Sequence, residues 1–207
     1  MADVAQAMRD PSQVAYEEPH WAEDTMFRVL KVMLDHKIRI GLETSGHTCH
    51  TDQQDSEFAT LLGAVVAVGY QPLAMNLAAP DILQVRDLAA ANPKAFGHSM
   101  AKLRHIMIYV CCDAAKPTGT VAVSRAILAR ARRVSGLILR SDDRIEVENS
   151  MSMMDRVISS CRSRALEWLH VLRGAVGYTP LLRLLQTNMK ILTNVELTHV
   201  VLHGPDL

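Results

Sequence analysis

An apolar seam in the last third of the chain constrains the fold more than any other sequence feature. Its members follow one another at intervals of four, three, four, three and four residues, the spacing of a narrow coiled-coil stripe. They are Met154, Ile158, Cys161, Ala165, Trp168 and Leu172. Ser152 with Asp155 three residues later resembles a helix-capping pair. The pattern predicts one long helix from Met153 to about Gly174, whose seam suits either core packing or self-association.

Shorter patterns predict further helices and a few strands. Apolar stripes at helical spacing indicate helices, and alternation or short β-branched runs indicate strands. We expect helices over 20–36, 56–68, 80–92, 120–133 and 179–188, strands over 37–43, 105–112 and within 190–203, and a hairpin joining 137–139 to 144–147. No internal repeat is apparent. The expected fold class is α+β, predominantly α-helical with a few short strands and hairpins.

The domain organisation follows from where the regular patterns begin. Residues 1–19 are polar and acidic, with two prolines, and are predicted to form a loosely ordered arm. Residues 20–207 are predicted to form a single compact domain, because no segment has the composition of a linker. With 49% hydrophobic and 21% charged residues among 207, the composition excludes a disordered chain.

Several sequence features bear on where the protein works. The longest apolar run, Leu61–Val68, is far shorter than the roughly 20 residues that span a bilayer, and no secretory signal is visible. The four cysteines are too few and too irregularly spaced for a disulfide scaffold. We therefore expect an intracellular protein that is soluble or peripheral to a membrane.

Charge is distributed unevenly along the chain. Its 22 basic and 22 acidic side chains cancel, yet residues 1–100 carry 7 basic and 13 acidic residues, and residues 101–207 carry 15 and 9. This gives an acidic half over 20–100 and a basic half over 101–207. Seven cations between Lys102 and Arg133 are opposed only by Asp113. They are Lys102, Arg104, Lys116, Arg125, Arg130, Arg132 and Arg133.

These cations are the main candidate binding residues. Arginine forks match the geometry of phosphate groups, and Tyr109 is the one aromatic residue nearby that could stack on a base. The segment therefore predicts contact with a phosphate-rich surface, either RNA backbone or anionic lipid. The alternative is a solvated surface whose charges pair within the chain.

Two motifs raise the possibility of other chemistry. His47, Cys49 and His50 are three metal-capable side chains in four residues and could hold zinc with a further ligand, although the spacing is not that of a standard zinc motif. Gly97-His98-Ser99-Met100-Ala101 resembles a nucleophile elbow, but the elbow needs a strand before its serine, and here the strand-like segment follows. We expect no catalytic residues, and no cofactor unless zinc binds.

The sequence thus favours a non-enzymatic, self-associating protein that contacts a phosphate-rich surface. Such a protein would suit the matrix or nucleocapsid layer of a virus, and the order of elements, two early helices and then a strand, resembles that of small viral matrix proteins. In this interpretation the partners are other copies of the chain, together with RNA or an anionic membrane surface. The alternatives are a zinc-site or Cys/His enzyme or regulatory module built on the loop with His47, Cys49 and His50, and a helical protein–protein adaptor.

Overall fold

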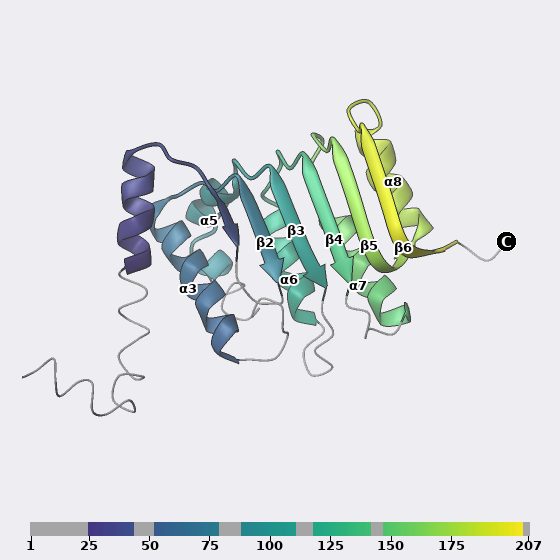
Figure 1. Cartoon of the computed structure of the whole chain (residues 1–207), viewed down its shortest axis with the longest axis horizontal. Helices are drawn as coiled ribbons and strands as arrows, with labels where there is room; N and C mark the ends of the chain where they lie inside the picture. The colour runs from purple at the N-terminus through teal and green to yellow at the C-terminus, as the bar shows by residue number, and fades with distance from the viewer. Residues whose placement is uncertain (1–24, 44–51, 79–87, 111–117, 142–146, 205–207) are drawn as a thin grey trace, which may run out of the picture.

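The computed structural model contains a six-stranded, entirely parallel β-sheet in which strands follow one another in sequence order (Figure 1). It describes residues 25–43, 52–78, 88–110, 118–141 and 147–204. The strands are β1 (Gly41–Glu43), β2 (Ala74–Ala78), β3 (His105–Val110), β4 (Gly136–Ser141), β5 (Trp168–Gly177) and β6 (Asn194–His203). In every neighbouring pair the register is parallel, from Gly41 opposite Ala74 to Trp168 opposite Asn194.

Each connection between strands contains a helix. The labelled helices are α3 (Asp52–Val68), α5 (Pro93–Met100), α6 (Thr118–Leu128), α7 (Val147–Ser160) and α8 (Tyr178–Asn188), and residues 25–35 and 88–91 are also helical. Helices α6, α7 and α8 lie behind the sheet in Figure 1, and none of the described helices lies over its other face there. The expected α+β, predominantly helical class is therefore wrong, because alternating strands and helices build an α/β fold. Among the described helices, none is long and apolar enough to cross a membrane.

The chain is a structural repeat, which the sequence analysis missed. Parallel strands in register begin every 26 to 33 residues, at Gly41, Ala74, His105, Gly136, Trp168 and Asn194. The same apolar spacing recurs at β3, β4 and β5, at positions i, i+3 and i+5 counted from two residues before each strand, and all nine side chains are at most 1% exposed. They are Leu103, Ile106 and Ile108, Val134, Leu137 and Leu139, and Leu166, Leu169 and Val171. Each unit buries this face against its neighbours, as in solenoid proteins.

The predicted helix from Met153 to Gly174 is also wrong. Helix α7 ends at Ser160, and β5 begins at Trp168. Serine side chains support this break: Ser160 Oγ donates to Arg156 O at 2.6 Å, and Ser163 Oγ donates to Val134 O at 2.6 Å. The second bond holds the chain beside the start of β4, where a continuing helix could not lie. Neither glycine nor proline marks the stop, so the seam's spacing was a coincidence across two elements.

The predicted hairpin is wrong for a related reason. Residues 136–141 form β4 between β3 and β5, and residues from Val147 onward form α7. The sheet-facing alternation of β4, with Leu137 and Leu139 fully buried, was mistaken for one arm of a local pair. Other predictions are confirmed: the helical segment within 20–36, α3, β3, α8 and β6 lie where patterns indicated, within a few residues. Helix α6 begins where predicted but ends at Leu128, so the expected extension to residue 133 is wrong.

Candidate functional site: a basic edge of the sheet

Six helix-to-strand turns lie side by side along the edge where the strands begin. Main-chain hydrogen bonds join each turn to the next: Leu73 N donates to Ile40 O, Arg104 N to Leu73 O, Ser135 N to Arg104 O, Glu167 N to Ser135 O and Thr193 N to Glu167 O, all at 2.7–3.3 Å. The turns therefore follow the strand spacing of about 4.8 Å, and the row extends over about 24 Å.

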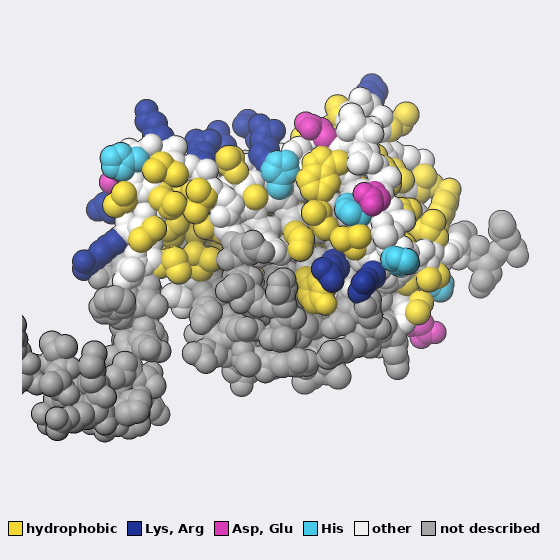
Figure 2. Space-filling model, in the orientation of Figure 1, with side chains coloured by type: hydrophobic (Ala, Val, Ile, Leu, Met, Phe, Trp, Pro, Cys, Tyr) yellow, Lys and Arg dark blue, Asp and Glu magenta, His cyan; other side chains and the backbone are white. Residues whose placement is uncertain are grey.

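These turns concentrate positive charge. Over residues 36–40, 69–73, 101–104, 129–135, 161–167 and 189–193, all of which the structure describes, ten Lys and Arg side chains are accompanied by a single carboxylate, Glu167. The cations are Lys37, Arg39, Lys102, Arg104, Arg130, Arg132, Arg133, Arg162, Arg164 and Lys190. We term these ten residues the basic edge. Figure 2 shows Lys and Arg side chains along this upper rim.

The sequence-predicted cations divide into three groups. Lys102, Arg104, Arg130, Arg132 and Arg133 come together in two neighbouring turns of the basic edge, although they are separated by up to 31 residues in the chain. Arg125 lies on α6, where it lines a groove of about 660 Å³ between α6 and α7 with Arg156 and Arg162. Lys116 lies outside the described residues.

Within the basic edge, side chains differ in how firmly they are held. Arg130 is half-buried, its guanidinium lies 5.3 Å from the centre of the Phe96 ring, and its Nη1 donates to Ala126 O at 3.1 Å. It therefore secures the turn after α6. Arg104, Arg132 and Arg133 are exposed. Exposed guanidinium groups are available to a phosphate, whereas Arg130 combines charge with packing.

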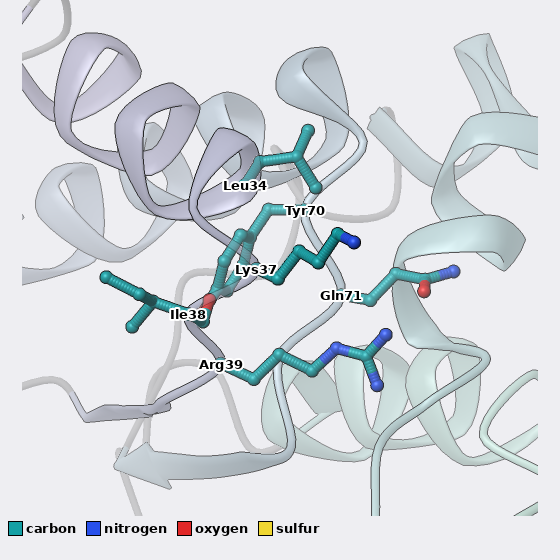
Figure 3. Close-up of a pocket in the computed structure, with 6 residues that line it drawn as sticks. All are labelled: Leu34, Lys37, Ile38, Arg39, Tyr70 and Gln71. Carbon is teal, nitrogen blue, oxygen red and sulfur yellow. The ribbon is translucent and has the colours of Figure 1, made fainter.

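A small pocket lies at the β1 end of the basic edge. Its volume is about 350 Å³, and it is lined by Leu34, Lys37, Ile38, Arg39, Tyr70 and Gln71. Figure 3 shows Lys37, Arg39 and Gln71 extending in one direction from the turns before β1 and β2. The floor is fixed, because the buried Tyr70 hydroxyl accepts from Ile40 N at 2.9 Å and donates to Ile38 O at 3.1 Å.

The backbone around Lys37 explains how the cations reach this pocket. Ile38 N donates to Met33 O and Lys37 N to Leu34 O, which together form a Schellman ending for the helix over residues 25–35. Lys37 occupies the left-handed position at φ 56°, where glycine is the usual residue. The chain thus has a lysine at a position where glycine, which adopts this conformation without strain, would be expected.

A second surface feature is the open face of the sheet. The Trp168 indole lies across Gly136, where any Cβ would overlap it, and stacks against His105 with ring centres 5.8 Å apart. Four residues farther along β3 and β4, the Arg140 guanidinium lies 5.5 Å from the centre of the Tyr109 ring. A depression of about 250 Å³ beside Trp168 is lined by residues of β1 to β5, including Asn76, Met107 and Ile138.

The remaining predicted sites fall into three cases. His47, Cys49 and His50 lie outside the described residues, and within the described part no cluster of His, Cys, Asp or Glu suits a metal ion. Ser99 is a fully buried residue of α5 whose Oγ donates to Val65 O at 3.3 Å, so it is not an exposed nucleophile. Of the self-association seam, Met154 and Ile158 lie in the core, Cys161 is half-buried after α7, and Trp168 and Leu172 are on β5.

Sequence reasoning missed half of the basic edge: Lys37, Arg39, Arg162, Arg164 and Lys190. The missing signal was the repeat itself. Cations occur just before the buried i, i+3, i+5 residues of several strands, so aligning those triplets would have brought the cations together. A scan against family models, a search of curated proteins and a search of solved structures each found no match to this chain.

Proposed function

We propose that this protein is a non-catalytic binding protein whose basic edge holds the phosphate backbone of a nucleic acid. The observation that supports this best is the ten-to-one excess of cations over carboxylates in six adjacent turns. The repeat brings together cations that lie far apart in the sequence. If these charges only paired with carboxylates of the same chain, such a concentration of one sign would not be needed.

The arrangement suits a linear ligand. About 24 Å of one duplex strand carries about seven phosphates, a number comparable to the cations in the row. An anionic membrane, in contrast, presents its phosphates as a plane, whereas these cations lie along a narrow rim between the helix layer and the open sheet face. Contacts of this kind would position a backbone without reading its bases.

Binding should therefore depend steeply on salt and weakly on sequence. We would measure fluorescence anisotropy of a labelled single-stranded RNA with the full chain, between about 50 and 200 mM salt. The double variant Arg132→Gln/Arg133→Gln removes two exposed guanidinium groups and leaves the packed Arg130 in place. We expect affinity to fall at least about tenfold, because bonds to charged groups are worth about 1.5–3 kcal/mol each, and the salt slope to fall by about 1.4.

A matched control is Arg183→Gln, an exposed arginine on α8 away from the edge turns. It changes the net charge without touching the basic edge and should leave the affinity within about twofold. Equal losses in the control and the double variant would contradict a localised site. If the protein binds acidic vesicles tightly and does not bind RNA, the ligand of the basic edge is a surface of lipid headgroups and not a nucleic acid.

The open sheet face supports a second candidate function, binding of a partner protein. Trp168, Tyr109 and Arg140 belong to the residue types that dominate protein interfaces, and they occur together on this face. In this proposal the protein is still a protein–protein adaptor, but its contact surface is the sheet and not a helix. Trp168→Ala should abolish capture of such a partner while RNA affinity is retained, and loss of both activities would argue against separate surfaces.

A further inference from the structure

The pocket at the β1 end lies where the basic edge stops. Strand β1 is the outermost strand of the sheet order, and Figure 1 places the helix over residues 25–35 beyond it. Leu30 of that helix is buried in the core, and Leu34 lines the pocket. A nucleic-acid strand that follows the row of turns therefore reaches its last cations at this pocket.

The pocket combines positive charge with a concave shape. Lys37 and Arg39 line it and are exposed, and none of its lining residues is acidic. Within the described part of the chain, neither cation forms an ion pair. Lysine supplies a compact charge and arginine a planar fork, so the two can contact several oxygens of one phosphate group. A volume of about 350 Å³ suits one small anionic group.

The turns that carry these side chains are held in place. The Tyr70 hydroxyl bonds to both Ile38 O and Ile40 N, on either side of Arg39 in the chain. The Gln71 side chain donates from Nε2 to His98 O at 2.9 Å. Because the backbone of the pocket is already ordered, a ligand has only the exposed ends of the cations left to immobilise, which lowers the entropic cost of binding.

The conformation of Lys37 gives a second, independent reason to look for a ligand here. At φ 56° a residue with a β-carbon is strained, and glycine would end the helix over residues 25–35 at lower cost. Strain of this kind persists mainly where a functional group is needed at the strained position. Ending the helix does not require the lysine side chain, whereas binding an anion does.

We propose that this pocket binds the terminal phosphate of the strand that the basic edge holds, an inference that rests on the proposed function. A terminal phosphate monoester carries a charge of about −1.5 to −2 at neutral pH and three acceptor oxygens. Each internal phosphate of the backbone carries one negative charge. Two cations in one pocket match the larger charge, so the protein distinguishes a phosphorylated end from a hydroxyl end without reading bases.

Three RNAs of one sequence would test this inference with the full chain. One has a 5′-phosphate, one a 3′-phosphate and one hydroxyl groups at both ends, and each carries its fluorescent label internally. Anisotropy titrations at about 100 mM salt give the three affinities. We expect one phosphorylated RNA to bind at least about fivefold more tightly than the hydroxyl RNA, because its end makes additional bonds to charged groups. Arg39→Gln should reduce this ratio to less than about twofold.

Lys37→Gly separates binding from folding. It removes the ammonium group and the backbone strain together, so the midpoint of thermal unfolding should stay level or rise while the preference for the phosphorylated end is lost. His199→Gly is the matched control, since His199 is another non-glycine residue in the left-handed region, at φ 55° in β6. This control should keep the preference. Lys190→Gln, at the other end of the basic edge, should weaken binding of all three RNAs alike.

Three results would overturn the inference. One is equal affinity for the three RNAs, and another is a preference that both Lys37→Gly and Arg39→Gln leave intact. The third is a nucleoside monophosphate that binds as tightly as the phosphorylated RNA, which would make a free nucleotide the ligand of the pocket.

The proposed function and this inference fail in different ways. Arg132→Gln/Arg133→Gln should weaken binding of all three RNAs and leave their ratio unchanged, because both residues lie outside the pocket. Salt-dependent binding without an end preference would support the basic edge and contradict the terminal-phosphate pocket. Absence of binding to any of the three RNAs would contradict both.

Discussion

The middle of the sheet and its β6 end carry the same apolar spacing in different surroundings. Leu137 and Leu139 of β4 are fully buried, because strands flank them on both sides and helices cover them. Val195 and Leu197 of β6 have a neighbour on one side only and keep more than a third of their surface exposed. In a repeat structure, sequence therefore determines which residues face inward, and the adjacent unit determines whether they are buried.

The sharpest test of this comparison is the same type of truncation at both places. Leu139→Ala should lower the free energy of unfolding by about 2–5 kcal/mol, because it leaves a cavity in a packed layer. Leu197→Ala should cost under about 1 kcal/mol in a monomer, since much of its side chain is already in water. Urea denaturation at low protein concentration would measure both, and equal losses would contradict the difference in burial.

Much of the fold was readable from local patterns, and the errors share one physical cause. β3, α3 and α8 were predicted because each carries its own periodicity or capping signal. The seam from Met154 to Leu172 was interpreted as one helix because no glycine or proline separates α7 from β5. By chance, apolar residues of β5 continue the helical spacing of α7. Buried parallel strands also lack the polar alternation that identifies exposed ones, which disguised β5.

A second prediction concerns the row of residues that crosses the open sheet face. Gly136→Val should destabilise the fold by about 1–3 kcal/mol, because its side chain would take the space of the Trp168 indole and overpack the site. Asn194 occupies the same row in β6 and is exposed, so Asn194→Val should have little effect. Tryptophan fluorescence would report the displaced indole, and an unshifted spectrum in Gly136→Val would contradict this geometry.

The candidate site was less predictable than the fold, for a geometric reason. Lys102 and Arg133 could be grouped because they are near in sequence, whereas Lys37 and Lys190 meet the same edge only through five strand pairings. The order of charges along a chain does not show which turns lie side by side in the sheet. Once the buried triplets that begin at Leu103, Val134 and Leu166 are aligned, Arg132 and Arg164 occupy the same position, two residues before the triplet. Lys102 and Arg133 share the position one residue before it.

A third prediction addresses how the last unit is joined to the middle ones. The buried Asn188 side chain accepts from Leu166 N at 3.1 Å and donates to Leu184 O at 3.0 Å. Asn188→Ala should cost about 1–3 kcal/mol, because it leaves a buried N–H unpaired. The exposed Thr193 hydroxyl donates to Glu167 O at 2.9 Å in the next turn, and Thr193→Ala should cost about 1 kcal/mol or less. A larger loss for Thr193→Ala in thermal unfolding would reverse this ranking.

The smallest expected effect is a pH dependence at Asp155, where α7 meets the end of β5. Burial raises the pKa of this carboxyl above its ordinary value, against the opposing influence of the Gly177 N–H, which donates to Asp155 Oδ1 at 2.8 Å, and of His203. Because the folded carboxyl holds its proton more tightly than the unfolded one, its ionisation weakens the fold as the pH rises from the unfolded pKa through the folded pKa. Asp155→Asn keeps an oxygen acceptor for Gly177 and cannot ionise. The free energy of unfolding of this variant should therefore fall less than that of the wild type between acid and neutral pH. If denaturation curves show the same fall for both proteins, the Asp155 carboxyl is not the group responsible.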